Sequence, residues 1–302
     1  MRAFYYSLND SFALFLACAR KIVANFAYLC DNISIMKIGI STASFFSKVT
    51  TEDTFALIDE MGIDICEVFL TTFREYRKEY VDELAKRKGK LEVYSVHSLN
   101  QHFEPELFNP VARTREDAEY FFREMAYAAK VLDAKSYTFH GPARLKRTPY
   151  NINYKWMGER IDYLNGIMHE VTDGKAEIAY ENVHWTYFSL PEFYAELKKH
   201  TNVKTCLDIK QAMQSKISTY DYVNVMGDSL TNVHLCDYDA SGKLAVPGQG
   251  SFDFVELFKV LLDNGYDGPC MMELYAGNYN TFDEVRKGYE YLQDCLEKAK
   301  RR

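Results

Sequence analysis

Short apolar runs alternate with amphipathic segments from Met36 to the end of the chain. Segments such as TREDAEYFFREMAYAAKVLDA (114–134) have the periodicity of helices, and a less regular helical stretch is predicted over 211–226. The short apolar runs between such segments predict buried strands. These runs are KIGIS (37–41), DICEVFL (64–70), LEVYSVHS (91–98), SYTFHG (136–141), AEIAYE (176–181), VKTCLD (203–208), NVHLCD (232–237) and GPCMMEL (268–274).

Eight strands in strict alternation with eight helical segments predict parallel strands joined by crossover helices. An open doubly wound sheet also alternates, but eight units within residues 36–302 fit a (β/α)8 barrel better, because that fold needs about 250 residues. The stretch after the first strand, GISTASFFSKVT, contains neither GxGxxG nor a P-loop. We therefore predict an α/β chain with one TIM-barrel domain over residues 36–302.

Residues 1–35 precede this rhythm. Their apolar stretch is divided by Arg20 and Lys21, so neither half is long enough to span a bilayer. The ACA at 17–19 is similar to a signal-peptide cleavage site, but Asp10 and a single basic residue precede the apolar run. We expect 1–35 to be an N-terminal extension outside the fold, with an extra docking helix as the alternative.

Composition excludes several classes of protein. A net charge of −7 without a long basic run argues against a nucleic-acid surface, and seven scattered cysteines without CxxC pairs indicate reduced thiols. We expect a cytoplasmic protein with no membrane segment and a small-molecule substrate. The sequence leaves open whether the protein forms a homo-oligomer.

Polar residues gather where the predicted strands end, which is where a barrel of this kind places its active site. Taken alone, Glu67 or Asp237 is best explained as a helix cap or a loop partner. Four clustered residues are harder to explain in this way, because their carboxylates would repel one another without a cation. Glu181, Asp208, His234 and Glu273 form an oxygen and nitrogen donor set that suits one Mn²⁺, Mg²⁺, Co²⁺ or Zn²⁺ ion.

The chain from Met36 onward resembles the xylose isomerase-like barrel superfamily, in particular sugar-phosphate isomerases/epimerases and ketose 3-epimerases. The resemblance lies in YEN (180–182), CLDIKQA (206–212), NVHLCDY (232–238), PGQGSFDF (247–254) and MMELY (271–275). It implies that Glu181, Asp208, His234 and Glu273 bind one divalent metal. It also implies that Glu181 and Glu273 move the proton of a sugar or sugar phosphate through an enediolate intermediate.

Two departures limit what the resemblance implies. Gln211 stands where the family often has a histidine, and the loop after the seventh strand contains Lys243 but no arginine. His97, His140, Lys210 and Gln211 are our candidate substrate contacts. Lys210 would bind an anionic substrate, although its predicted loop position favours the alternative of a solvated lysine. The substrates of the best-known epimerases therefore do not transfer to this chain.

Two other functions remain open. The same barrel includes endonuclease IV-like zinc phosphodiesterases, whose strand-end histidines match His97 and His140, although Gln211 and the absence of Asp-x-His count against that chemistry. A non-catalytic sugar-binding barrel is the third class, and the presence of both Glu181 and Glu273 weighs against it.

Overall fold

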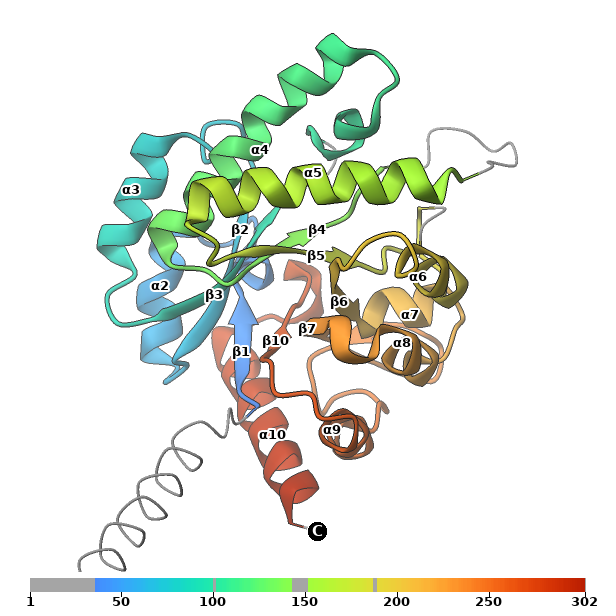
Figure 1. The fold of residues 1–302 in the computed structure, drawn as a ribbon. Helices are drawn as coiled ribbons and strands as arrows, with labels where there is room; N and C mark the ends of the chain where they lie inside the picture. Colours follow the sequence, from blue (N-terminus) through green and yellow to red (C-terminus); the bar gives the residue numbers. More distant parts are fainter. Residues whose placement is uncertain (1–35, 100–101, 143–151, 187–188, 302) are drawn as a thin grey trace, which may run out of the picture. The chain divides into compact units, whose positions relative to one another are not determined.

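Eight parallel strands close into a barrel, in the order β1-β10-β7-β6-β5-β4-β3-β2 (Figure 1). The computed structural model describes residues 36–99, 102–142, 152–186 and 189–301. The barrel strands are β1 (Ile38–Ser41), β2 (Ile65–Leu70), β3 (Glu92–Ser98), β4 (Ser136–Phe139), β5 (Glu177–Glu181), β6 (Lys204–Asp208), β7 (Leu230–Leu235) and β10 (Cys270–Met272). The predicted (β/α)8 barrel is confirmed.

Helices surround the barrel and connect successive strands. They are α2 (Thr51–Glu60), α3 (Lys78–Arg87), α4 (Ala112–Leu132), α5 (Tyr154–Thr172), α6 (Pro191–Leu197), α7 (Ile209–Gln214), α8 (Thr219–Met226), α9 (Phe254–Asp263) and α10 (Phe282–Lys300). Short 3₁₀ turns are η1 (Thr42–Phe45), η2 (Glu104–Phe108), η3 (Gly227–Ser229) and η4 (Ala276–Asn278). A small antiparallel pair, β8 (Asp237–Tyr238) with β9 (Leu244–Ala245), follows β7.

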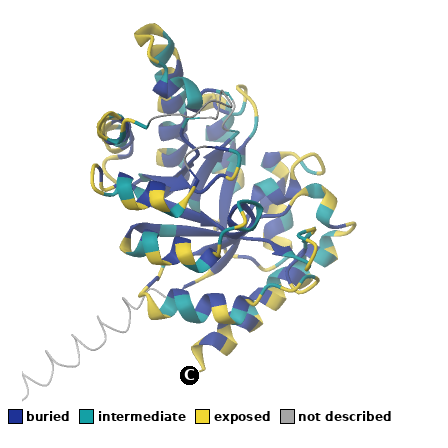
Figure 2. Cartoon of the chain, turned by 90° about the vertical axis from the view of Figure 1, so that its right-hand side faces the viewer, coloured by how far each residue is buried: buried dark blue, intermediate teal, exposed yellow. Residues whose placement is uncertain are grey.

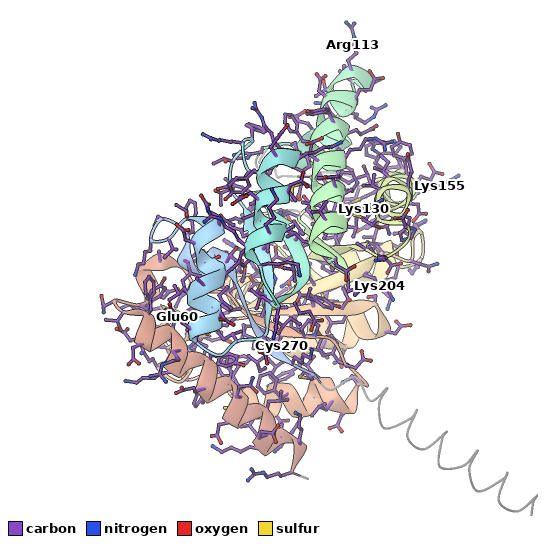
Figure 3. The ribbon with its side chains drawn as sticks, turned by 90° about the vertical axis from the view of Figure 1, so that its left-hand side faces the viewer. Glu60, Arg113, Lys130, Lys155, Lys204 and Cys270 are labelled. Carbon is purple, nitrogen blue, oxygen red and sulfur yellow. The ribbon has the colours of Figure 1, made fainter. Side chains whose placement is uncertain are left out.

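The hydrophobic core lies between the strands and the helices. Strands β1, β4 and β10 are buried along their whole length, and each long helix buries one stripe, as Figure 2 shows. The opposite helix faces carry charge, and Figure 3 shows Glu60, Lys130 and Lys155 pointing outward. Burial on one face and charge on the other explain the periodicity of the sequence.

Two local predictions need correction, and one lies outside the described residues. The segment predicted as one irregular helix over 211–226 forms two helices, α7 and α8, separated at the left-handed residue Lys216. The seventh strand ends at Leu235, so Asp237 belongs to β8 instead. The prediction that 1–35 are an extension outside the fold stays a prediction. No described helix has the length and apolarity that crossing a membrane requires.

Substitution of Gly39 tests how tightly β1 packs against its neighbours in the barrel. A Cβ at Gly39 in β1 would lie 2.6 Å from the carbonyl oxygen of Ile65 and 2.6 Å from Met271 Sδ. We expect Gly39→Ala to lower the free energy of unfolding by about 1–3 kcal/mol, because backbone from β2 must shift. Gly166→Ala in α5 is the matched control, since its Cβ meets nothing within 4 Å, and it should stabilise by roughly 0.5–1 kcal/mol. Urea denaturation measures both, and equal effects would contradict the prediction.

Candidate active site

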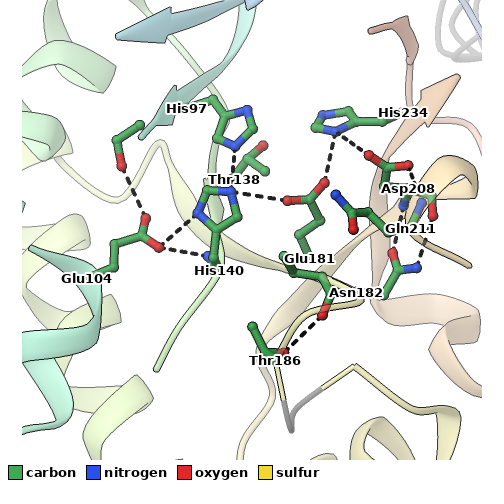
Figure 4. Close-up of polar contacts among 12 residues, drawn as sticks. His97, Glu104, Thr138, His140, Glu181, Asn182, Thr186, Asp208, Gln211 and His234 are labelled. Atoms are coloured by element: carbon green, nitrogen blue, oxygen red, sulfur yellow. Dashed lines mark hydrogen bonds and ion pairs between the residues drawn. The ribbon is translucent and has the colours of Figure 1, made fainter. Parts of the chain in front are cut away.

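The four residues predicted as metal ligands come together at the carboxyl end of the barrel. Glu181 ends β5, Asp208 ends β6, His234 lies in β7, and Glu273 directly follows β10. One donor atom from each lies within 4.8 Å of the others, and all four side chains are buried. Figure 4 shows three of them, Glu181, Asp208 and His234, facing one another from adjacent strands.

Asn182 fixes the ends of β5 and β6 relative to each other. Its side-chain amide donates to the Asp208 carbonyl at 2.9 Å and accepts from the Asp208 backbone N–H at 2.7 Å. Asp208 also caps α7, because its Oδ1 accepts from the backbone N–H of Gln211 at 2.9 Å. Its other oxygen, Oδ2, is buried, makes no hydrogen bond of good geometry and lies 3.1 Å from the ammonium nitrogen of Lys210. This oxygen is therefore already directed at a cation.

Glu67 is the centre of a hydrogen-bond network inside the barrel. The expectation that Glu67 is a helix cap or a loop partner is therefore wrong. Its carboxylate is fully buried and accepts from Ser95, Thr138 and Asn232. It also lies 3.1 Å from His234 Nε2 and 3.2 Å from His97 Nδ1. A carboxylate behind one imidazole nitrogen orients the ring, so His234 presents Nδ1 to the candidate metal site. The only signal in the sequence was one charge within the apolar run ICEVFL.

His97 and His140 lie side by side, with their Nε2 atoms 2.9 Å apart. Glu104 holds His140 through its Nδ1 and its backbone N–H, both at 2.9 Å. His140 Nε2 is also 3.3 Å from Glu181 Oε2, which links the histidine pair to the four-residue cluster (Figure 4). With each Nδ1 facing a carboxylate, the two Nε2 atoms require a proton or a cation between them. Glu104 lies in a 3₁₀ turn and had no recognisable sequence signal.

Lys210 is buried, so the alternative of a solvated loop lysine is wrong. Its side chain is 3% exposed, and Nζ lies 2.7 Å from Glu273 Oε2 and 3.1 Å from Asp208 Oδ2. Burial lowers the pKa of Lys210, but Asp208 and Glu273 outweigh burial and hold that pKa well above its ordinary value. The ammonium group is therefore charged and paired with two of the clustered carboxylates.

Burial and charge set the protonation of Asp208. Burial raises its pKa and Lys210 lowers it, while Glu181 and Glu273 raise it further, to about 7. Glu181 shows the opposite balance, because His234 and His140 overcome burial and lower its pKa. The carboxylates thus differ in the charge they carry near neutral pH.

A cavity of about 370 Å³ opens onto the cluster. Its wall includes all four predicted substrate contacts and both candidate proton-transfer glutamates, together with aromatic side chains. These residues are His97, His140, Lys210, Gln211, Glu181, Glu273, Phe46, Phe69, Trp185 and Tyr275. Gln211 is oriented by His184, whose backbone N–H donates to the Gln211 side-chain oxygen at 3.0 Å. The side-chain NH₂ of Gln211 is thereby turned away from His184.

Asp237 has a structural role, which agrees with the expectation that it is a helix cap or a loop partner. Its carboxylate accepts from the backbone N–H groups of Tyr238, Gly248, Gly250 and Phe252 at 2.8–3.1 Å. It therefore holds the PGQGSF loop against β8 and takes no part in the four-residue cluster.

Comparison with known families agrees with this geometry. A family model described as the xylose isomerase-like TIM barrel matches residues 55–295. The chain belongs to this family. The resemblance seen in the sequence is confirmed.

Several proteins are similar to this chain in structure or in sequence. D-psicose 3-epimerase from Clostridium cellulolyticum H10 superposes with a TM-score of 0.71 at 17% identity, over 86% of this chain and 99% of that one. The IOLI protein, solved with a zinc atom, superposes with a TM-score of 0.69 at 17% identity, over 87% and 99% of the two chains. A fructoselysine 3-epimerase of Escherichia coli O157:H7 is 39% identical over 54 residues, which is 18% of this chain and 20% of that protein.

Asp208 makes the stability of the metal-free protein depend on pH. Its folded pKa of about 7 exceeds its ordinary value of 3.8, so the folded state binds the extra proton between these values. This group therefore destabilises the fold increasingly as pH rises from 4 to 7. We expect Asp208→Asn to gain stability over the natural protein across that range, by up to about 1.4 kcal/mol per pH unit.

Urea denaturation in EDTA between pH 5 and pH 8 measures this difference. The control is Asp283→Asn, an exposed aspartate whose pKa Lys287 and Arg286 lower, so the substitution should cause a small loss of stability that stays constant over this pH range. A stability difference between Asp208→Asn and the natural protein that stays flat with pH would contradict the assignment.

Proposed function

We propose that this protein is a divalent-metal-dependent sugar isomerase or epimerase that moves a proton at the carbon beside a carbonyl group. The observation that carries the proposal is the buried cluster of Glu181, Asp208, His234 and Glu273 beside a cavity. Membership of the xylose isomerase-like family supports it, as do the named 3-epimerases among the structural relatives.

The donor set fits a divalent metal. Three carboxylates and one imidazole suit Mn²⁺, Mg²⁺, Co²⁺ or Zn²⁺, and the contact that the buried Asp208 Oδ2 makes with Lys210 is an ion pair and not a hydrogen bond of good geometry. Glu181, Asp208, His234 and Glu273 would hold the ion. When bound, the metal would act as a Lewis acid and stabilise the negative charge that develops on the substrate oxygens.

Glu181 and Glu273 are the candidate proton-transfer residues. Both line the cavity, and they approach it from β5 and β10, which are separated by β6 and β7 in the barrel. One carboxylate removes the proton beside the carbonyl to leave an enediolate, and the other returns a proton to the opposite face. This two-sided arrangement is what an epimerase needs.

The lining of the cavity favours a neutral sugar over a sugar phosphate. Among its described residues, Lys210 is the single lysine or arginine, and Asp208 and Glu273 already balance its charge. A phosphate group would need additional cations or backbone donors. The NH₂ of Gln211 and the imidazoles of His97 and His140 would instead contact sugar hydroxyls, while Trp185 offers an apolar surface.

The zinc phosphodiesterase stays a second candidate because of one observation. His97, His140 and Glu181 also place three donor atoms within 4.8 Å of one another, which suits a second ion. Gln211 stands where that chemistry needs a histidine, which weighs against it. Metal analysis discriminates between the two, since three zinc ions per chain favour the phosphodiesterase and one ion favours the isomerase.

We expect one divalent ion per chain and a ligand set that includes His234. His234→Ala should weaken Mn²⁺ binding at least a hundredfold, beyond the tenfold to hundredfold typical of losing an outer partner. His184→Ala is the matched control, because His184 contacts Gln211 and none of the four ligands. Isothermal titration measures both. Full occupancy in both His234→Ala and Asp208→Asn would rule out this ligand set.

Glutamine variants test the proton transfer. Glu181→Gln and Glu273→Gln keep an amide oxygen for coordination but lose the base, so each should slow turnover about 10²–10⁴-fold. If the two act on opposite faces, each variant should lose deuterium incorporation from D₂O on one face, as read by NMR. Glu177→Gln, at the start of β5, is the control on the same strand. Near-normal turnover in both metal-loaded variants would end the proposal.

A further inference from the structure

Lys210 directs an ammonium group at two carboxylates of the candidate metal site. Its Nζ lies 2.7 Å from Glu273 Oε2 and 3.1 Å from Asp208 Oδ2. His234 Nδ1 faces the same two oxygens, at 3.5 Å and 4.0 Å. Lys210 and an ion held by this cluster would therefore share the carboxylates of Asp208 and Glu273.

The surroundings of Lys210 leave it no better partner. The side chain is 3% exposed, and besides the two carboxylates its Nζ lies 4.8 Å from the centre of the Tyr275 ring. A buried ammonium that leaves its carboxylates loses strong interactions, so Lys210 stays close to the cluster whether or not an ion is bound.

Charge balance links Lys210 to the metal. With all four ligands deprotonated on a metal ion, the three carboxylates would carry three negative charges and the imidazole none, and the divalent ion and the ammonium would together offset them. Without an ion, the ammonium group of Lys210 reduces the mutual repulsion of the Asp208 and Glu273 carboxylates. With an ion present, two cations lie within a few ångströms of each other in a buried setting, where their repulsion is strong.

We propose that Lys210 is a built-in counter-cation, which stabilises the metal-free carboxylate cluster and weakens the binding of divalent metal to it. This inference rests on the proposed function, because it concerns the same metal site. It assigns Lys210 a positioning role toward Asp208 and Glu273, in place of the anion contact expected from the sequence.

The test uses the full-length chain and four variants. Lys210→Met and Lys210→Gln remove the charge, and Lys210→Arg keeps it. Lys48→Met is the matched control, because Lys48 binds the Tyr279 carbonyl at 2.8 Å, lies over the Tyr279 ring and touches none of the clustered carboxylates. Mn²⁺ affinity is measured by isothermal titration, and the melting temperature is measured in EDTA and in Mn²⁺.

Two effects of opposite sign are expected for the neutral variants. Lys210→Met and Lys210→Gln should bind Mn²⁺ at least about tenfold more tightly, because the repelling charge is gone. The same variants should melt at a lower temperature in EDTA and show a larger rise on adding Mn²⁺. Lys210→Arg and Lys48→Met should stay within about threefold of the natural affinity. A purely structural lysine would instead lower both stability and affinity.

Other outcomes separate this inference from the proposed function. Unchanged or weaker Mn²⁺ binding in both neutral variants, with normal binding by the natural protein, overturns the role of Lys210 and leaves the isomerase standing. Binding by the neutral variants alone supports the counter-cation and contradicts a metal-dependent activity of the natural chain. Absence of binding in every variant overturns both. Lys210→Gln keeps the test decisive if Lys210→Met fails to fold.

Discussion

The burial of several carboxylates in one small volume is the constraint on which the rest of this structure depends. Glu67 is buried inside the barrel, and Glu104, Glu181, Asp208 and Glu273 are buried at its carboxyl end. Isolated buried charges are very costly, so each must find hydrogen-bond donors or cations. The surrounding histidines, hydroxyls, amides and one lysine are arranged to meet that requirement.

The barrel supplies these partners because parallel strands bring distant parts of the sequence to the same level. Glu67 on β2 reaches Ser95 on β3, Thr138 on β4 and Asn232 on β7, which spans the barrel interior. The interior beneath the site is therefore polar. The apolar stabilisation comes from the layer between strands and helices, where residues such as Phe122, Phe254 and Leu292 are buried. Separating the two layers lets the site carry charge without disrupting the core.

The sequence predicted the barrel, its strands and the gathering of the four candidate ligands, because strand alternation and strand ends are local patterns. It failed where the outcome depends on contacts between distant segments. Nothing near Lys210 in the sequence indicates that Glu273, 63 residues away, will bury it. The role of Glu67 likewise depends on Asn232 and His234, far along the chain, and the turn that brings Glu104 to His140 has no periodic signal. These positions are determined by the closure of the barrel.

The carboxylates fall into two groups by how their charge is satisfied. Glu67 and Glu104 accept hydrogen bonds from fixed donors in the barrel wall, and the neighbouring histidines hold the pKa of Glu67 well below its usual range despite burial. They orient His234, His97 and His140.

Asp208, Glu181 and Glu273 form the second group, which is satisfied less completely. Asp208 Oδ2 is paired with the Lys210 ammonium but makes no hydrogen bond of good geometry, and Glu181 and Glu273 face the cavity. Satisfied polar networks rigidify a structure, whereas unsatisfied ones destabilise it until a ligand completes them. The first group therefore forms the rigid framework, and the carboxylates of the second group are the ones able to bind a cation and to move a proton. Such a division allows a site to be rigid in its geometry and still reactive at the cavity.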